Sequence, residues 1–420
     1  GNDGIRSDGT ATVRTSNLSG NERFGILSLG PLNVSDSTIS GNSTGISADQ
    51  GVTLTATTVR SNAGYGLTTS RTSNATITDS TVSHNGMNGV LNHGTMLIDQ
   101  CTINSNSAGN SGRSGGGVLN LGTLTLRDST VSQNSGRAGG GVSNEASYSG
   151  SHATIEGSTI AHNTSDDGGG LYNSASMLVT NSTISSNTSM RSGGGIAAAG
   201  FTTIRQSTIT DNFASDDGDG FYQRCCGYLS VGSSIIAGNG NGLDVGGGAG
   251  TINSAGYNLV GGGSRVSDFA AAGDQFGVDP GLGPLANNGG LTQTHAPVFD
   301  RLAINAGDPM IDGGGEFDQR GAPFARVVGG RLDAGAFEFR GTIEVDTLVD
   351  ESDGDYRQGD LSLREALTLV EARAQNETIT FASGLSGTLN LSLGELTVYS
   401  GYDLSLSIEG PGAEQLTVQV

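Results

Sequence analysis

Val34-Ser-Asp-Ser-Thr-Ile39-Ser-Gly-Asn42 is the stretch from which the architecture of this chain follows. It places a second aliphatic residue five positions after the first, and an asparagine three positions later. The same spacing recurs in ten copies, from Val13 to Asn239, with successive asparagines 20 to 29 residues apart. A repeat of this period is typical of stacked structural units.

The two aliphatic positions predict how each unit bends. Val34 and Ile39 would face opposite sides of one continuous strand, yet both positions are aliphatic in every copy. We therefore expect a corner near Asp36-Ser37 that lets both side chains point inward. A third apolar residue follows each asparagine, from Ile26 to Leu243. Helical periodicity is missing. The pattern predicts an all-β, right-handed parallel β-helix with rungs stacked about 4.8 Å apart.

The repeated asparagine has a structural explanation in such a coil. Equivalent side chains lie above one another, so asparagines can form a hydrogen-bonded ladder. Asparagine also tolerates the left-handed conformation of a tight corner. We expect the Ser-Thr pair before the second aliphatic residue to face outward. The asparagines predicted to be structural are Asn42, Asn62, Asn85, Asn106, Asn134, Asn163, Asn187 and Asn212.

Composition excludes some partners. The chain has 420 residues and a net charge of −21, and all 20 of its basic residues are arginines. This balance argues against nucleic acid and anionic membrane surfaces as partners, and it leaves room for cations, especially calcium. The sequence contains no recognisable signal peptide or membrane span. Hydrophobic content of 34% suits a narrow coil.

Three regions follow one another along the chain. Residues 1–256 are regular rungs, residues 257–340 lose the repeat, and residues 341–420 start a second β-helical unit. Ser362 and Glu365 form a capping box that predicts a helix at about 362–374, which would cover the open end of a coil. From rung five onward, Gly triplets such as Gly115-Gly117 predict close-packed corners with positive φ. No Lys-Ser/Thr follows them, as a phosphate-binding loop would require.

Several motifs resemble known families. The runs from Asp279 to His295 and from Asp333 to Glu338 resemble the choice-of-anchor Q segment of large bacterial surface proteins. Leu361-Ser-Leu-Arg-Glu-Ala366 resembles the Cys-Ser-Leu-Arg-Glu-Ala motif that opens β-helical domains in the same proteins, with Leu361 in place of Cys. The rungs are similar to the repeats of polymorphic outer-membrane adhesins, with Ile in place of their Phe. The resemblance implies a bacterial cell-surface or secreted protein and names no activity.

Two acidic stretches are candidates for calcium, and no other cofactor is indicated. Carboxylate oxygens are the ligands that calcium prefers. The candidate ligands are Asp216, Asp217, Asp219, Asp350, Asp353 and Asp355. Asp166-Asp167 lies two rungs before Asp216-Asp217, roughly 10 Å away by stacking, which is near the upper carboxylate separation of an inverting glycosidase. We see no aromatic platform for a sugar. Cys225-Cys226 is either a vicinal disulfide or two free thiols.

These observations favour a structural or adhesive extracellular protein, and we expect it not to be an enzyme. Its partners would be other copies end to end, other surface components, or glycans. The chain begins inside a rung and ends where a new coil is being built. This suggests either a head-to-tail filament or a window from a longer tandem polypeptide.

The alternative is a carbohydrate-active enzyme, either a polysaccharide lyase or a glycoside hydrolase, on a β-helix scaffold. That function would require a groove with three or more convergent acids on adjacent rungs. Smooth flanks of Ser, Thr and Asn would instead favour the scaffold or adhesin.

Overall fold

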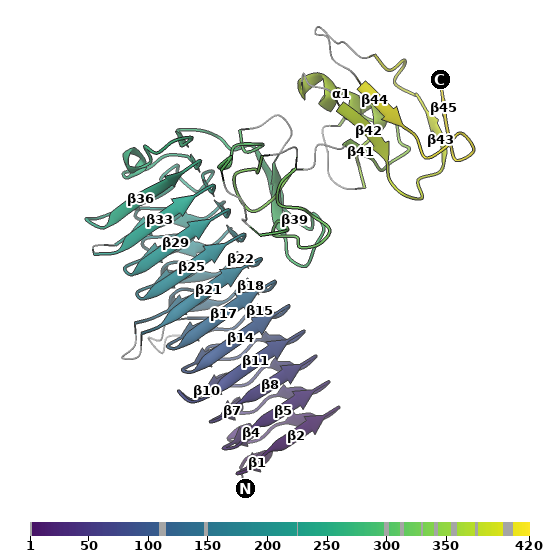
Figure 1. The fold of residues 1–420 in the computed structure, drawn as a ribbon. Helices are drawn as coiled ribbons and strands as arrows, with labels where there is room; N and C mark the ends of the chain where they lie inside the picture. The colour runs from purple at the N-terminus through teal and green to yellow at the C-terminus, as the bar shows by residue number, and fades with distance from the viewer. Residues whose placement is uncertain are drawn as a thin grey trace.

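The chain winds as a parallel β-helix, and a smaller unit follows it (Figure 1). The computed structural model describes residues 2–108, 115–146, 150–224, 226–297, 302–310, 315–328, 331–339, 343–353, 359–373, 377–397 and 406–420. Cys225 and Asp355 lie outside these residues, and Cys226 lies within them.

Each rung gives one strand to each of three parallel sheets, which have 11, 11 and 12 strands within the described residues. Sheet A contains β1 (Ile5–Ser7), β4 (Phe24–Ser28), β7 (Thr44–Ala48), β10 (Leu67–Thr69), β13 (Val90–Asn92), β16 (Val118–Asn120), β20 (Val142–Asn144), β24 (Leu171–Asn173), β28 (Ile196–Ala198), β32 (Phe221–Gln223) and β35 (Val245–Gly247). Sheet B contains β2 (Ala11–Arg14), β5 (Leu32–Ser35), β8 (Val52–Thr55), β11 (Asn74–Thr78), β14 (Thr95–Asp99), β17 (Thr123–Arg127), β21 (His152–Glu156), β25 (Ser176–Thr180), β29 (Phe201–Arg205), β33 (Tyr228–Gly232) and β36 (Thr251–Gly256). Sheet C contains β3 (Asn17–Ser19), β6 (Thr38–Ser40), β9 (Thr58–Arg60), β12 (Thr81–Ser83), β15 (Thr102–Asn104), β18 (Thr130–Ser132), β22 (Thr159–Ala161), β26 (Thr183–Ser185), β30 (Thr208–Thr210), β34 (Ile235–Ile236), β37 (Leu259–Val260) and β38 (Gln275–Phe276).

The lengthened corner between sheets C and A carries a short sheet of its own. The strands of this sheet are β19 (Ser135–Ala138), β23 (Thr164–Asp167), β27 (Thr188–Ser189) and β31 (Phe213–Ala214). The Gly triplets follow it, and their first members, such as Gly139 at φ 65°, have the predicted positive φ. A Cβ on the second member, Gly140, would lie 2.5 Å from the Thr164 carbonyl oxygen. The triplet is therefore a close-packed corner.

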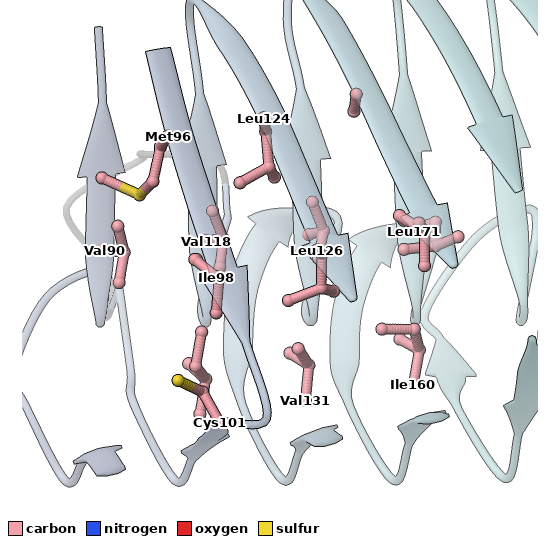
Figure 2. Packing of buried hydrophobic residues seen from close by; sticks show 14 of the residues in the cluster. Val90, Met96, Ile98, Cys101, Val118, Leu124, Leu126, Val131, Ile160 and Leu171 are labelled. Carbon is pink, nitrogen blue, oxygen red and sulfur yellow. The ribbon is translucent and has the colours of Figure 1, made fainter. Parts of the chain in front are cut away.

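The predicted inward positions form one continuous core. Val34, Ile39 and Ile46 are all buried, as are their equivalents along the coil. Side chains of successive rungs lie in rows inside the coil (Figure 2). One assignment was wrong. Leu243 is 37% exposed, and Val245 takes the third apolar position instead, because the register pairs it with Phe221.

The corner between sheets B and C lies where the spacing predicts it. Asp36 has a φ of 50°, and the equivalent residue of later rungs is also left-handed. The serine that follows this residue was predicted to face outward, but it is buried. Its hydroxyl accepts a hydrogen bond from the backbone of the preceding rung, as Ser158 Oγ does from Ser129 N at 3.1 Å. Cys101 occupies this serine position, as expected for an ordinary rung residue.

The asparagine ladder is confirmed. Each side-chain amide donates to the Oδ1 of the asparagine on the next rung, at 2.7–3.0 Å, from Asn21 to Asn239. The left-handed residue is not the asparagine but the one before it, such as His84 at φ 55°. A second ladder was not predicted. It is formed by the last residues of four neighbouring strands of sheet A, Asn92, Asn120, Asn144 and Asn173.

The irregular region covers one side of the coil. We call residues 282–339 the cover segment; it includes the antiparallel pair β39 (Leu282–Ala286) and β40 (Thr294–Pro297). It packs on the outer threonines of sheet C. Gln319 accepts a hydrogen bond from Thr183 Oγ1 at 2.6 Å and donates one to Thr159 Oγ1 at 3.0 Å. A 3₁₀ turn, Val266–Asp268, precedes the segment.

The last unit has a core of its own. The helix α1 (Leu363–Arg373) packs on β41 (Ile343–Val345), which pairs with β42 (Glu377–Phe381) and through it with β44 (Leu406–Glu409). The strands β43 (Gly387–Asn390) and β45 (Leu416–Gln419) form a second parallel pair. Ser362 and Glu365 make the capping box, in which Glu365 N donates to Ser362 Oγ at 3.1 Å.

Candidate functional site

A cleft of about 840 Å³ lies where the cover segment meets the corner between sheets B and C. One wall is formed by the ends of sheet B strands and the corner residues after them. The other is formed by Asp308, Met310 and residues from Gly315 to Gly321. Carboxylates lie on both walls: Asp128 and Glu156 on the coil, Asp308 and Glu316 on the cover segment.

Asp128 occupies the left-handed corner position after β17, with a φ of 49°. The same position on the next rung is Gly157, also left-handed at φ 58°. A Cβ at residue 157 would clash with Asp128 Oδ1. The missing side chain therefore lets the Asp128 carboxylate lie against the next rung, where it is partly shielded from water.

The charges around Asp128 shift its titration. Arg127 makes two hydrogen bonds to Asp99, at 3.1 and 2.6 Å, and lies 3.7 Å from Asp128. Burial raises the pKa of Asp128, and the charges of Asp99 and Glu156 add to the rise while Arg127 opposes it. Because burial disfavours the charged form and outweighs the opposing charge of Arg127, the pKa of Asp128 lies above that of an ordinary aspartate.

The strand register aligns the other charged groups. Arg127, Glu156, Thr180 and Arg205 are consecutive partners along the end of sheet B. Arg205 also lines the cleft, and no ion pair of its side chain is found among the described residues. On the same wall, Asn181 Nδ2 donates to Phe317 O at 3.2 Å, and Ser233 Oγ accepts from Asp308 N at 3.1 Å. These contacts hold the cover segment against the coil.

This arrangement suits acid–base chemistry. A carboxyl group that stays protonated can donate a proton, and a second, exposed carboxylate can act as base or nucleophile. Asp128 and Glu156 lie on adjacent rungs, with Asp128 N donating to Glu156 O at 3.1 Å.

The predicted calcium ligands of the coil have other partners. Asp219 is buried and accepts hydrogen bonds from the backbone of Ala214, Asn241 and Leu243 at 2.7–3.3 Å. Asp217 accepts from the Gly218 and Gly247 backbones. These carboxylates stabilise the corner, and Asp216 lies beside them in the chain.

The described ligand candidates of the last unit, Asp350 and Asp353, also form other contacts. Asp350 binds Arg364 through two hydrogen bonds, at 2.8 and 3.1 Å, and the Arg364 hydrogen bond lowers the pKa of Asp350. Asp353 N donates to Glu365 Oε1 at 3.1 Å, and Asp355 lies outside the described residues. Within the part of the chain that the structure describes, no three His, Cys, Asp or Glu side chains are grouped as a metal site. Calcium binding stays a prediction.

The acidic pair at Asp166-Asp167 is not placed for catalysis. Asp167 is buried and forms ion pairs with Arg191 at 2.9 Å and Arg224 at 2.8 Å. The sequence pattern pointed to Asp166-Asp167 as a carboxylate pair and did not single out Asp128 and Glu156, which lie in the cleft. The available signal was Gly157, a glycine at a corner position where most rungs carry a side chain.

Comparisons with known proteins bear on the coil. Residues 1–135 match the family model described as "Right handed beta helix region", which supports the predicted fold class and a β-helix repeat protein. A search of curated proteins found no match. Among solved structures, the chain is similar to one described as "Crystal structure of pectate lyase Pel9A", at 15% identity and a TM-score of 0.45, covering 80% of this chain and 87% of that one.

We expected the chain not to be an enzyme, and this expectation is corrected: the solved structure to which the chain is similar is described as a pectate lyase. In the described residues no helix is both long and apolar enough to cross a membrane.

Proposed function

We propose that the protein binds a polysaccharide in the cleft and cleaves its glycosidic bonds. The observation that carries this proposal is the convergence of Asp128, Glu156, Asp308 and Glu316 on one cleft of about 840 Å³. Two of these acids lie on adjacent rungs and two on the cover segment, and a groove with three or more convergent acids is what favours a carbohydrate-active enzyme on this scaffold.

Hydrolysis is the reaction that the charges support best. Asp128 in its protonated form gives its proton to the glycosidic oxygen as the bond to the anomeric carbon breaks. In one route Glu156 deprotonates a water that attacks that carbon. In the other, Glu156 attacks the carbon itself, and a water deprotonated by Asp128 then attacks the same carbon and releases Glu156, so that in both routes the water oxygen ends on the anomeric carbon. The raised pKa of Asp128 supports its role as the acid.

The charge of the chain supports a neutral polysaccharide. The net charge is −21, and five acidic residues line the cleft, the four named above and Asp318. A polyanion such as a polyuronate would be repelled on approach. Arg205 is the group that would favour such a polymer, and with it a β-elimination in place of hydrolysis.

The test is cleavage of a panel of neutral and acidic polysaccharides, followed by reducing-end release and by the ultraviolet absorbance of unsaturated products. D128N and E156Q should each lower the rate by about 100-fold or more, the usual contribution of a positioned acid or base. D36N is the matched control, because Asp36 holds the same left-handed corner position outside the cleft.

The outcomes separate the candidates. Reducing ends without unsaturated products support hydrolysis. Unsaturated products that disappear in R205A would identify a lyase. A wild-type protein that cleaves none of the polymers, or a D128N variant as active as D36N, would contradict the proposal.

A second candidate function is attachment at the bacterial cell surface, as a scaffold or adhesin. It is supported by the first rungs, where the exposed positions of sheet B are small and polar, such as Thr12, Asn33 and Thr53. This candidate includes an extracellular location and end-to-end partners, and it agrees with the resemblance to surface proteins with choice-of-anchor Q segments. Binding of the labelled protein to bacterial or host cells would test it.

A further inference from the structure

Two aromatic side chains lie side by side on the outer face of sheet B. Phe201 begins β29 and Tyr228 begins β33, and the strand register pairs them directly. Their ring centroids are 6.2 Å apart, and the rings are tilted by 42°. Phe201 is 69% exposed and Tyr228 is 37% exposed. The neighbours on either side of the pair are Ser176 and Thr251, too small to cover the rings.

The rings share a face with the cleft. Side chains alternate along each strand, so Phe201, Thr203 and Arg205 point outward while Thr202 and Ile204 are buried. On the next strand Tyr228 and Ser230 point outward in the same way. Arg205 and Ser230 line the cleft.

The face therefore runs without interruption from the rings to the cleft. Figure 1 shows the sheet B strands β25, β29 and β33 running toward the side of the coil that carries the cover segment. Four residues along a strand span about 13 Å, which is the reach of a short oligosaccharide and more than a single sugar.

The chemistry of the rings indicates their ligand. An exposed pair of large aromatic side chains on a rigid strand is unusual on a solvated surface. One face of a pyranose ring presents C–H groups that pack on an aromatic ring, while its hydroxyls stay in water. Thr203, between the rings and the cleft, and Ser230, at the edge of the cleft, offer hydroxyls to those of a sugar.

We propose that Phe201 and Tyr228 form a distal sugar-binding subsite for the polysaccharide that enters the cleft. The inference rests on the proposed function, and it specifies a polymer long enough to reach from the cleft to the rings. The two residues are positioning residues that hold the chain across sheet B. Short oligosaccharides that occupy the cleft alone do not reach them.

The experiment compares F201A/Y228A with wild type on the full-length protein. Affinity electrophoresis against the panel polysaccharides measures binding, and steady-state kinetics measure cleavage of a polymer and of short oligosaccharides. The double variant should weaken polymer binding roughly tenfold and raise the polymer KM to match. Its kcat/KM on the short substrate should be unchanged.

Two further variants make the result specific. F201W/Y228W keeps aromatic faces in place and should retain wild-type affinity. F213A removes another exposed aromatic side chain, on the sheet formed by β19, β23, β27 and β31, and should have no effect.

The outcomes distinguish this inference from the function on which it rests. Cleavage by wild type with an unchanged polymer KM in F201A/Y228A would overturn the subsite and leave the proposed function standing. Polymer binding that depends on the two rings, without cleavage of any substrate, would support the subsite and overturn the cleavage. Equal losses on polymer and short substrate would also overturn the subsite.

Discussion

The amide ladder is directional, and its last member is not an asparagine. Every Nδ2 donates toward the next rung, so the final acceptor needs no amide proton of its own. Asp244 fills this position, and its Oδ1 accepts from Asn239 N and Nδ2, both at 2.8 Å. At the corner between sheets B and C, the series of serine acceptors continues to Asn258 and ends in the same way at Asp274, whose Oδ1 accepts from Asn258 N and Nδ2. An aspartate suits these ends because a carboxylate only accepts.

Removing an interior amide should destabilise the coil. In N163A, Asn134 N and Nδ2 lose their acceptor, Val131 O loses the side-chain amide that donates to it, and Asn187 Oδ1 keeps only the backbone N of residue 163 as a donor. We expect a loss of about 1–3 kcal/mol of unfolding free energy, the cost of leaving buried polar groups unpaired. Chemical unfolding followed by circular dichroism measures it.

N17A is the matched control, because Asn17 is an exposed asparagine on the outer side of β3. It should unfold within about 0.5 kcal/mol of wild type. Equal stability of N163A and N17A would show that the ladder does not contribute to the fold.

Single residues were predictable where the repeat carries the signal. The spacing of Val34, Ile39 and Asn42 predicts the inward side chains, the corner and the ladder. It does not separate the buried serine from the exposed threonine of the Ser-Thr pair, because both residue types are common in strands. The pairing of Phe201 with Tyr228 was also missed, since the residues are 27 positions apart and only the register makes them neighbours.

At the scale of elements, the three sheets could be predicted and the cover segment could not. Contacts within the coil repeat every rung, so the period implies them. The contacts of the cover segment are unique: His295 reaches Ser185 across 110 residues, and Gln319 reaches Thr159 across 160. No periodic pattern encodes such contacts, and the cleft depends on them. For the same reason Asp128 and Glu156 were not recognised as a site.

The cover segment encloses a charged cluster. Arg320 binds Asp318 and lies between the rings of Phe324 and Phe337. Arg326 is fully buried, and its guanidinium donates to the Asp333 and Gly335 carbonyls. Asp333 and Glu338 complete the cluster. Its three carboxylates exceed its two guanidinium groups, so one proton restores neutrality.

We expect the stability of the cover segment to depend on pH through Glu338. Burial raises the pKa of Glu338 to about 8, and the charge of Asp333 adds to the rise. The folded state therefore keeps a proton that the unfolded state releases at its ordinary pKa. Stability should fall as pH rises from about 5 to about 8, and level off above that.

Limited proteolysis of the segment under mild denaturant, at pH values from 5 to 9, would measure this dependence. E338Q mimics the protonated acid and should flatten it. E344Q, which changes an exposed glutamate on β41, should leave it as in wild type. A wild-type segment that becomes more resistant between pH 5 and 8 would contradict the assignment of the proton.

Three hydrophobic cores are found among the described residues: that of the coil, that of the last unit, and a small one formed by sheet C and the cover segment, which includes Ile235, Leu259 and Ala303. The coil core extends from Val13 to Phe269, and the core of the last unit extends from Ile343 to Leu389 around α1, with no residue in common. Each of these two cores is closed by its own strands, so each unit can unfold without exposing the interior of the other. Calorimetry of the intact chain should therefore show two transitions.

Matched substitutions assign these transitions. Ile160 and Ile379 are both fully buried isoleucines on interior strands of their sheets. I160A should lower the coil transition and I379A the other, each by about 2–5 kcal/mol of unfolding free energy at constant pH. If either substitution shifts both transitions together, or if wild type melts in one step that both variants lower, then the two cores form a single cooperative unit.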